Sequence, residues 1–313
     1  DGTLALGRVG SRGSNLEFDL IKGVTVEFWL NKSEFITSKT AKEVIFDLWN
    51  GEASSSAGYG RLTVLATGAA DGVEPLRVSF MSGTNGSQYA SAVTSQTTAS
   101  FADASWHHYA LSLKNDSGTT YVRTYLDGHK KSTASYSLDI QAVTGSLQAR
   151  IGSLIASPSG SSAAANAGTL SGSVDEFRFW KTRRTDKQIL ENYWTQVRGG
   201  TNNEIANAEL GVYYKFNEGI TGTSSTDSTV LDYSGRISNG TWTNYPGSSA
   251  RNTGSAIDSS TSVVSGTLEY KDPIIYDFHP DVKSLRDELI LTGSIHDYST
   301  QSSIKDSIPA WAV

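Results

Sequence analysis

The sequence has no cysteine, one methionine and six prolines among its 313 residues. Without cysteine it can form no disulfide, thiolate metal site or iron–sulfur cluster, and it has no cysteine nucleophile. Charge is sparse as well: 19% of the residues are charged, and 26 Lys and Arg against 32 Asp and Glu give a net charge of −6. An acidic chain without basic clusters predicts no nucleic-acid partner, because phosphate binding needs Lys and Arg gathered on one face.

Long apolar runs are missing too. No stretch of about 18 apolar residues occurs, so the sequence predicts no insertion into a membrane. The chain starts at Asp1 without a signal-peptide pattern, which indicates a processed chain or a piece of a longer one. What is abundant is glycine, with 30 residues, together with Ser, Thr and Asn, a composition typical of many turns and short strands.

Short apolar runs with a period of two follow one another along the chain. In residues 24–30 apolar and polar side chains alternate, which places them on opposite faces of a strand. Asp127-Gly128 predicts a two-residue hairpin, since glycine adopts the positive φ that such turns need. The spacing predicts an all-β fold, a sandwich of two antiparallel sheets. Comparable runs occur at 44–49, 61–65, 76–80, 106–113, 120–126, 149–151 and 174–180.

A short helix is expected after these runs. Thr185 and Gln188 fit a capping box, in which each side chain bonds the backbone N–H of the other residue. Ile189, Tyr193 and Trp194 follow at helical spacing. The helix should therefore pack these three side chains on the sandwich.

The sequence divides into three parts. Residues 1–243 carry the sandwich, residues 244–272 are a polar linker, and residues 273–313 form a helical tail. A tail of this size is too small for a large core, so we expect it to dock on a neighbouring subunit, either another copy or a different protein. The alternative is that it packs on its own sandwich. The expected docking residues are Leu285, Leu289 and Trp311.

Several segments, taken in order, resemble a known family. Over about residues 15–243 the chain is similar to the laminin-G-like, concanavalin A-like jelly-roll domains. The resemblance implies a β-sandwich that binds glycans, calcium or protein partners and that hydrolyses glycans in some relatives, and the fold alone does not choose among these. The segments are Gly-Val-Thr-Val-Glu-Phe-Trp (23–29), Trp-His-His-Tyr-Ala (106–110), Tyr-Leu-Asp-Gly (125–128), Gly-Ser-Val-Asp-Glu-Phe-Arg-Phe-Trp (172–180) and Tyr-Tyr-Lys-Phe-Asn-Glu-Gly (213–219).

Two carboxylates are expected to meet at one rim of the sandwich. Asp175 and Glu218 each share a predicted strand face with aromatic residues, which places both on the core side at strand ends. Half-buried carboxylates need a cation, a shared proton or backbone donors. Calcium suits such oxygen ligands, and the resemblance implies a structural calcium near this edge. Asp232 is a third candidate ligand, with an Asx-turn as its alternative. The alternative for Asp175 and Glu218 is that they cap backbone N–H groups or pair with Arg178 or another basic residue.

Catalysis is not expected. Glycosidases need two carboxylates at a fixed separation, whereas the adjacent Asp175 and Glu176 point to opposite faces of a strand. His107 and His108 also point to opposite faces, so we expect one of them to be buried and hydrogen-bonded and the other exposed.

Four tryptophans, Trp29, Trp49, Trp106 and Trp180, are candidates for stacking on sugar rings. The alternative for each is packing in the core or under a loop. Trp29 and Trp180 lie on the strand face opposite the apolar one, so they are the better candidates for contact with a glycan or a protein partner.

The C-terminal residues 279–311 are similar to tails of virion structural proteins of large tailed bacteriophages. Together these observations predict a non-enzymatic structural protein of a phage particle, located in the virion, that uses a lectin-like sandwich for surface display or adhesion. Its partners would be other virion proteins or copies of itself, and surface glycans. The alternative is a secreted or cell-surface carbohydrate-binding module. Calcium is the one cofactor expected.

Overall fold

The computed structural model of the protein describes residues 15–35, 42–68, 74–155, 168–197, 209–218, 228–235 and 238–242. The chain divides into two units, residues 1–256 and 257–313, and every described residue belongs to the first. In this part of the chain no helix is long and apolar enough to cross a membrane. The predicted linker and tail, with Leu285, Leu289 and Trp311, lie outside the described residues, and their docking role stays a prediction.

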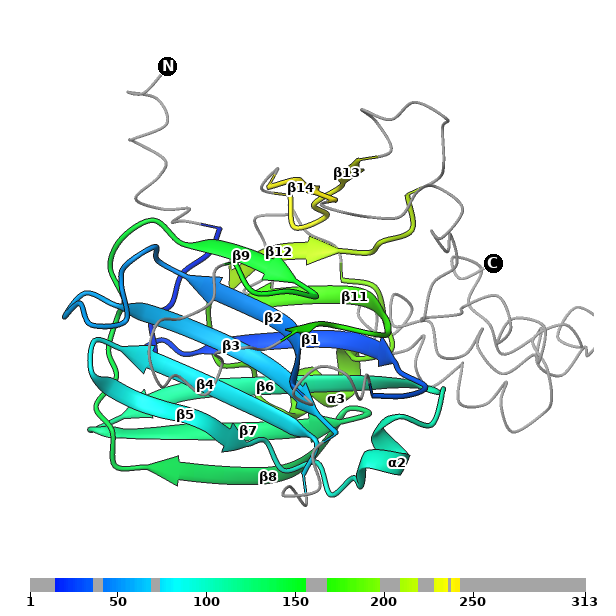
Figure 1. The fold of residues 1–313 in the computed structure, drawn as a ribbon, viewed down its shortest axis with the longest axis horizontal. Coiled ribbons are helices and arrows are strands. Elements are labelled where there is room, and N and C mark those ends of the chain that lie inside the picture. Colours follow the sequence, from blue (N-terminus) through cyan, green and yellow to red (C-terminus); the bar gives the residue numbers. More distant parts are fainter. Residues whose placement is uncertain are drawn as a thin grey trace, which may run out of the picture. The chain divides into compact units, whose positions relative to one another are not determined.

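Two large β-sheets lie face to face (Figure 1). Sheet 1 has the strand order β12-β11-β1-β6-β7-β8, and its neighbouring strands are antiparallel. Its strands are β12 (Leu210–Tyr214), β11 (Ser173–Trp180), β1 (Val24–Asn31), β6 (Trp106–Asp116), β7 (Thr119–Leu126) and β8 (His129–Tyr136).

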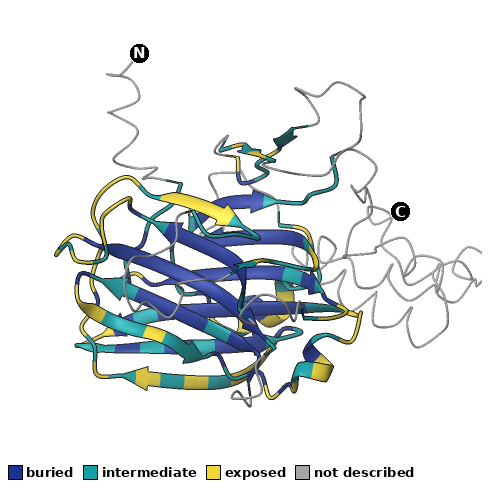
Figure 2. Ribbon diagram, viewed as in Figure 1, coloured by how far each residue is buried: buried dark blue, intermediate teal, exposed yellow. Residues whose placement is uncertain are grey.

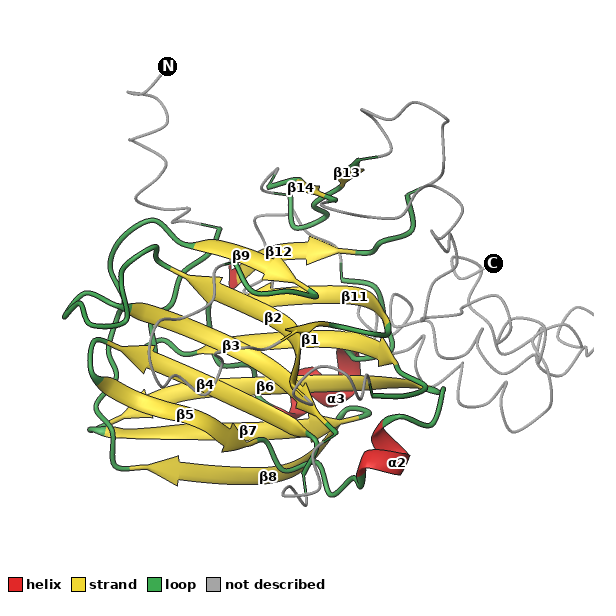
Figure 3. Cartoon of the chain, viewed as in Figure 1, coloured by secondary structure: helices red, strands yellow, loops and turns green. Residues whose placement is uncertain are grey.

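Sheet 2 has the strand order β10-β2-β3-β4-β5, with β9 beside β2. The short β10 runs parallel to β2, and the other neighbours are antiparallel. The two-sheet antiparallel sandwich with few helices that the sequence predicts is confirmed (Figure 3). The remaining elements are β10 (Gly168–Thr169), β2 (Lys42–Trp49), β3 (Gly60–Thr67), β4 (Leu76–Ser82), β5 (Asn85–Ser91), β9 (Gln148–Ile151), a small pair β13 (Thr229–Val230) and β14 (Gly240–Thr241), and the helices α2 (Thr98–Phe101) and α3 (Asp186–Asn192).

The hydrophobic core lies between the two sheets, whose central strands are mostly buried (Figure 2). Val24, Val26 and Phe28 of β1 are 0% exposed, as the alternation predicts. From the other sheet, Phe46 of β2 packs against Phe177 of β11 with ring centroids 5.0 Å apart. Burying one large apolar side chain contributes about 1.5–3 kcal/mol, so this layer supplies the main stabilisation of the sandwich.

The outer face of sheet 1 is covered by α3. Ile189 of the helix packs against Ala110 of β6 and Tyr125 of β7, and all three are 0% exposed. The predicted capping box is confirmed: Gln188 N–H donates to Thr185 Oγ1, and Thr185 N–H donates to Gln188 Oε1. Sheet 1 therefore has a second buried layer on the side away from the core.

Strand β11 contains one extra residue. Along β1, Glu27 pairs with Arg178 and Trp29 pairs with Asp175, so three steps on β11 lie opposite two on β1. Glu176 has a positive φ of 49° within this bulge. The prediction that Asp175 shares the core face with the aromatic residues of β11 is wrong, because the extra residue breaks the alternation and leaves Asp175 opposite Trp29, on the outer face.

Periodicity does not outline two of the edge strands, β5 of sheet 2 and β8 of sheet 1. Only the predicted hairpin at Asp127-Gly128 points to β8. The side chains of both strands are mainly half-buried or exposed, so neither strand has an apolar face. Lys130 and Lys131 lie on β8. Lysine on an edge strand disfavours pairing with another chain. The sequence also gave no sign of the short α2, which a capping box between Thr97 and Ser100 begins.

Candidate functional site

Trp180 is fully buried on the outer face of sheet 1. It packs with Leu210 and Tyr213, and the Arg184 guanidinium lies 3.8 Å from its ring centroid. The prediction that Trp180 contacts a glycan or a partner is therefore wrong. Trp180 does lie away from the core, but the chain itself covers this part of the outer face.

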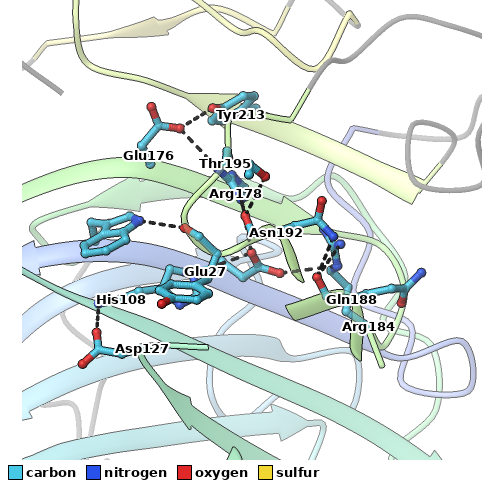
Figure 4. Close-up of polar contacts among 12 residues, drawn as sticks. Glu27, His108, Asp127, Glu176, Arg178, Arg184, Gln188, Asn192, Thr195 and Tyr213 are labelled. Carbon is cyan, nitrogen blue, oxygen red and sulfur yellow. Dashed lines mark hydrogen bonds and ion pairs between the residues drawn. The ribbon is translucent and has the colours of Figure 1, made fainter. Parts of the chain in front are cut away.

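A cluster of buried charged groups centred on Glu27 lies beneath α3 (Figure 4). Three groups surround its carboxylate: Arg184 Nε at 3.6 Å, Arg178 Nη1 at 3.7 Å and His108 Nε2 at 3.8 Å. The four side chains are between 0% and 4% exposed. A substrate cannot reach these atoms, so the cluster serves to position the elements around it.

Burial and the neighbouring charges shift the pKa values in this cluster in opposite directions. Burial raises the pKa of Glu27, but the two guanidinium groups and the imidazole around it outweigh burial and lower this pKa below its ordinary value. Burial lowers the pKa of His108 more than the neighbouring Glu27 raises it. Glu27 is therefore ionised and His108 neutral near pH 7, and the carboxylate is balanced by arginine.

Arg178 connects the cluster to the end of α3. Its Nη1 donates to the carbonyl oxygen of Asn192 at 2.9 Å, and its Nη2 donates to the carbonyl oxygen of Thr195. On its other side Nη2 lies 3.4 Å from Glu176 Oε2, which also accepts the Tyr213 hydroxyl (Figure 4). The last carbonyls of a helix need donors from outside it, so Arg178 fixes where α3 ends.

The residue after α3, Tyr193, contacts sheet 1 through its ring and its carbonyl. The ring stacks on Trp29 with centroids 6.1 Å apart and planes at 24°, within the usual range for aromatic pairs. Trp29 Nε1 donates to the Tyr193 carbonyl oxygen at 3.0 Å. The His108 ring lies 5.7 Å from Trp29 and 5.5 Å from Tyr193. Trp29 and Tyr193 are both half-buried, so part of this aromatic pair is at the surface.

The β7–β8 hairpin supports Tyr193 from the side. The predicted two-residue turn is confirmed, with φ of 50° at Asp127 and 76° at Gly128. A Cβ at Gly128 would lie 2.4 Å from Cδ1 of Tyr193. Both the turn and the ring therefore require glycine at this position.

Trp106 begins β6 beside the aromatic pair. In the register of β1 and β6, Trp29 pairs with His108 and Asn31 pairs with Trp106. Because side chains alternate along a strand, Trp106 lies on the same face as Trp29 and diagonally across from it, within reach of an aromatic side chain. Trp106 is half-buried. Trp29, Trp106 and Tyr193 thus form an aromatic group at one end of sheet 1.

At the same end of sheet 1 an imidazole lies between two carboxylates, on the face of β6 opposite Trp106. His107 Nδ1 lies 3.0 Å from Asp127 Oδ2, and His107 Nε2 lies 3.2 Å from Asp103 Oδ2. The side chains of His107, Asp127 and Asp103 are 23%, 40% and 37% exposed. Burial lowers the pKa of His107, but the two carboxylates outweigh burial and raise it. We name as the rim site the residues Trp29, Asp103, Trp106, His107, Asp127 and Tyr193.

The predicted calcium ligands Glu218 and Asp232 lie beyond β12. Glu218 Oε1 accepts the backbone N–H of the residue before Asp232 at 2.8 Å. Asp232 Oδ1 accepts the N–H groups of Tyr213 and Ser234, and its Oδ2 accepts from the Ser234 hydroxyl and the Ser238 N–H. The Ser234 contact is the Asx-turn considered as an alternative for Asp232.

Asp175, the remaining predicted ligand, lies on β11, where its Oδ1 accepts the Glu176 N–H at 2.9 Å. Within the described part of the chain, no three His, Asp or Glu side chains are grouped so as to hold a metal ion. The described carboxylates therefore do not form the cluster expected of a calcium site. Calcium binding stays a prediction, which the melting temperature with and without EDTA tests.

The sequence singled out Trp29, whose contact with a glycan or partner stays a prediction, and did not group it with the other residues of the rim site. Trp106 was considered but set below Trp180, and Tyr193 was assigned to the buried face of a helix. One signal was present: pairing residues 24–30 with 106–113 antiparallel brings Trp106 close to Trp29. Asp103 carried no periodic signal, although it lies only four residues before His107.

The sequence matches the family model described as the concanavalin A-like lectin/glucanases superfamily over residues 11–190, more than half of the chain. No curated protein matches the sequence.

Several solved structures are similar in fold. One is a Bacteroides ovatus protein provisionally designated as carbohydrate-binding, with 20% identity and a TM-score of 0.44 over 71% of this chain and 52% of that one. The chain thus spans about half the length of that protein. The CBM40 of the Ruminococcus gnavus IT-sialidase, bound to α2,3-sialyllactose, has 11% identity and a TM-score of 0.34 over 58% of this chain and 100% of that one. Tailspike protein 2 of bacteriophage CBA120 has 12% identity and a TM-score of 0.36 over 63% of this chain and 27% of that one. At these values the likenesses add nothing to the family match.

Proposed function

Because the chain belongs to the concanavalin A-like lectin/glucanase superfamily, we propose that it binds carbohydrate and that the rim site makes the contact. The observation that carries this proposal is the group of half-buried aromatic side chains at one end of sheet 1, Trp29, Trp106 and Tyr193. Aromatic rings offer apolar area at a low cost in side-chain entropy, and the ring faces of sugars are apolar.

Part of the rim site is held in place by contacts within the chain. Tyr193 is held by Trp29 through ring stacking and a hydrogen bond, by Gly128 through close packing, and by Arg178 through the end of α3. A rigid contact surface loses little freedom when it binds, which favours affinity. The buried charge cluster supports this arrangement from below.

Trp49 is the alternative aromatic candidate, on sheet 2. Its Nε1 donates to the Glu52 carbonyl oxygen at 2.8 Å, and the Arg61 guanidinium lies 5.4 Å from its ring centroid. Arg61 itself is 3% exposed and forms a bidentate pair with Asp47. These contacts fit a structural role for Trp49, which makes it the matched control for Trp106.

The test is a glycan array with the full chain, followed by calorimetry on the best glycan. We expect Trp106→Ala to weaken binding at least about tenfold, or roughly 1.4 kcal/mol, and Trp49→Ala to leave it near the wild-type value. Circular dichroism checks that both variants are folded. Equal binding by Trp106→Ala and the wild type would contradict a rim contact, and no binding to any glycan would contradict the function.

The proposed module binds its glycan and does not hydrolyse it. A glycosidase needs a general acid whose pKa is raised. At the rim site the Ser105 N–H and then His107 lower the pKa of Asp103 below its ordinary value, against a smaller effect of burial. Asp103 is therefore ionised and suited to accept hydrogen bonds from sugar hydroxyls.

We propose the surface of a bacteriophage particle as the setting, with the sandwich displayed for adhesion. The support for this setting is the similarity of residues 279–311 to tails of virion structural proteins. The partners of this tail would be other virion proteins or copies of this chain. A secreted or cell-surface module with the same glycan contact is the alternative, and finding the chain in purified particles would decide between them.

A further inference from the structure

We propose that the rim site selects uncharged sugars and rejects sugars that carry a carboxylate or sulfate group. This inference rests on the proposed function and concerns the charge around the aromatic rings. Two carboxylates at the rim have partly exposed side chains, Asp103 at 37% and Asp127 at 40%. Asp127 directly precedes Gly128, which packs against the Tyr193 ring, so a ligand on Tyr193 lies within the field of this carboxylate. Asp103 is joined to Asp127 through His107.

Both carboxylates are held in place with acceptor capacity left. Asp103 Oδ1 accepts the Ser105 N–H at 2.8 Å, and Asp127 Oδ1 accepts the His108 N–H at 2.9 Å. The second oxygen of each faces His107. An ionised carboxylate has about four lone-pair sites, so each one can still accept a hydrogen bond from a sugar hydroxyl.

His107 does not neutralise the negative charge of Asp103 and Asp127 that a ligand meets. Both of its ring nitrogens face the carboxylates, at 3.0 and 3.2 Å. Even when His107 is protonated, the group of three keeps a formal charge of −1. An acidic sugar would have to displace one of these internal contacts to reach the imidazolium.

Three basic residues close to the rim are engaged elsewhere. The Lys32 side chain is 0% exposed and its Nζ lies 2.7 Å from Glu43. The Arg178 side chain is 1% exposed. Lys130, just beyond the β7–β8 turn, is paired with Asp186 at the start of α3.

Among the described residues, a ligand carboxylate at the rim thus meets like charge and no free bidentate donor, the arrangement that discriminates by repulsion. A neutral sugar instead finds aromatic faces and fixed hydrogen-bond acceptors. This combination assigns uncharged hexose or N-acetylhexosamine units to the rim site.

The experiment compares paired glycans on the full chain: neutral oligosaccharides such as lactose, each beside its sialylated, uronic acid or sulfated counterpart. We expect the acidic member of each pair to bind at least about tenfold more weakly at low salt, with a smaller gap at high salt. Asp127→Asn should reduce the difference in affinity between the neutral and the acidic glycan of each pair. This change removes the charge and keeps the turn, because asparagine also adopts positive φ.

The outcomes separate the two proposals. Trp106-dependent binding that prefers the acidic glycans, or a gap that Asp127→Asn leaves unchanged, overturns the charge selection while the proposed function stands. Absence of any Trp106-dependent glycan binding overturns the proposed function, and the selection with it.

Discussion

Two adjacent residues, His107 and His108, show how strongly one step along a strand changes a side chain's chemistry. His108 is 1% exposed beside Glu27, and burial lowers its pKa. The His107 side chain is 23% exposed, and Asp127 and Asp103 raise its pKa despite an opposing effect of burial. The expected contrast between one buried and one more exposed histidine is confirmed, but the ring nitrogens of the buried one have no hydrogen-bond partner.

These opposite shifts predict a stability maximum near neutral pH. A raised folded-state pKa stabilises below the unfolded value of about 6.5, and the stabilisation is lost as pH rises through the raised pKa. The stabilisation that His107 contributes should therefore be lost as pH rises above about 6.5. A lowered folded-state pKa has the opposite effect, so His108 should cost stability as pH falls below about 6.5. Urea unfolding at a series of pH values on both sides of about 6.5 measures the acidic and the alkaline limb of this stability profile.

Variants assign each limb of that profile to its residue. His107→Gln should flatten the alkaline limb and leave the acidic one unchanged. Titration of the histidine ring protons by NMR provides a second readout that does not depend on a substitution. A ring at position 107 that titrates below the ordinary pKa of histidine would show that the two carboxylates do not hold it charged.

At the scale of elements, α3 is bound to sheet 1 at both ends. Asp186 in its first turn accepts hydrogen bonds from Arg123 and the Tyr125 hydroxyl. At the other end Arg178 and Trp29 donate to the last carbonyls. A helix of seven residues is too short to be stable alone, so these contacts with the sheet keep it folded.

Arg178→Met should therefore destabilise the sandwich by about 3–5 kcal/mol, because it leaves Glu27 with less compensation and removes donors from two carbonyls. Urea unfolding measures this loss. Adding Glu27→Gln should restore part of the stability, since the remaining buried charge is then removed.

A control for this prediction lies on the exposed side of α3. The side chain of Lys187 is 80% exposed and forms an i,i+4 pair with Glu191, a kind of contact that contributes little. Lys187→Met should leave the unfolding midpoint close to the wild-type value. If Arg178→Met behaves like Lys187→Met, Arg178 does not anchor the helix.

Many of the strands, turns and helix ends could be predicted from the sequence, because interactions between neighbouring residues determine them. The alternation in β1, the glycine in the β7–β8 turn and the Thr185–Gln188 capping box are properties of a few adjacent residues, and all three are confirmed. Periodicity outlined neither of the polar edge strands β5 and β8, since an edge strand without an apolar face leaves no periodic signal. The hairpin signal alone pointed to β8.

The site was predicted less well, because it depends on contacts between distant residues. A bulge at Glu176 changes which face Asp175 occupies, and no periodicity reveals a bulge. Trp180 was placed away from the core, but the sequence does not show that this side is buried as well. Asp103 and Asp127 reach His107 from separate turns.

At the scale of the whole molecule, the division at residue 256 separates the described sandwich from residues 257–313. Removing residues 257–313 should leave the melting temperature and glycan binding of the sandwich near their full-chain values, because the described core and rim site lie before that point. Incorporation into particles should be lost. Differential scanning calorimetry and co-sedimentation with particles measure the two effects.

A truncated chain that melts well below the full chain would support the alternative that the tail packs on its own sandwich. A truncated chain that still enters particles would show that the tail is not the anchor.

The polar edge strands β5 and β8 affect how copies of the sandwich behave when they lie close together on one surface. Sandwich modules attached to one surface meet at concentrations far above those in dilute solution, and bare strand edges would then join into continuous sheets. The exposed polar side chains of β5 and the lysines of β8 make such joining unfavourable. Many copies could thus stand side by side as separate bodies, and weak single-site contacts with a glycan-coated surface would add up to firm attachment.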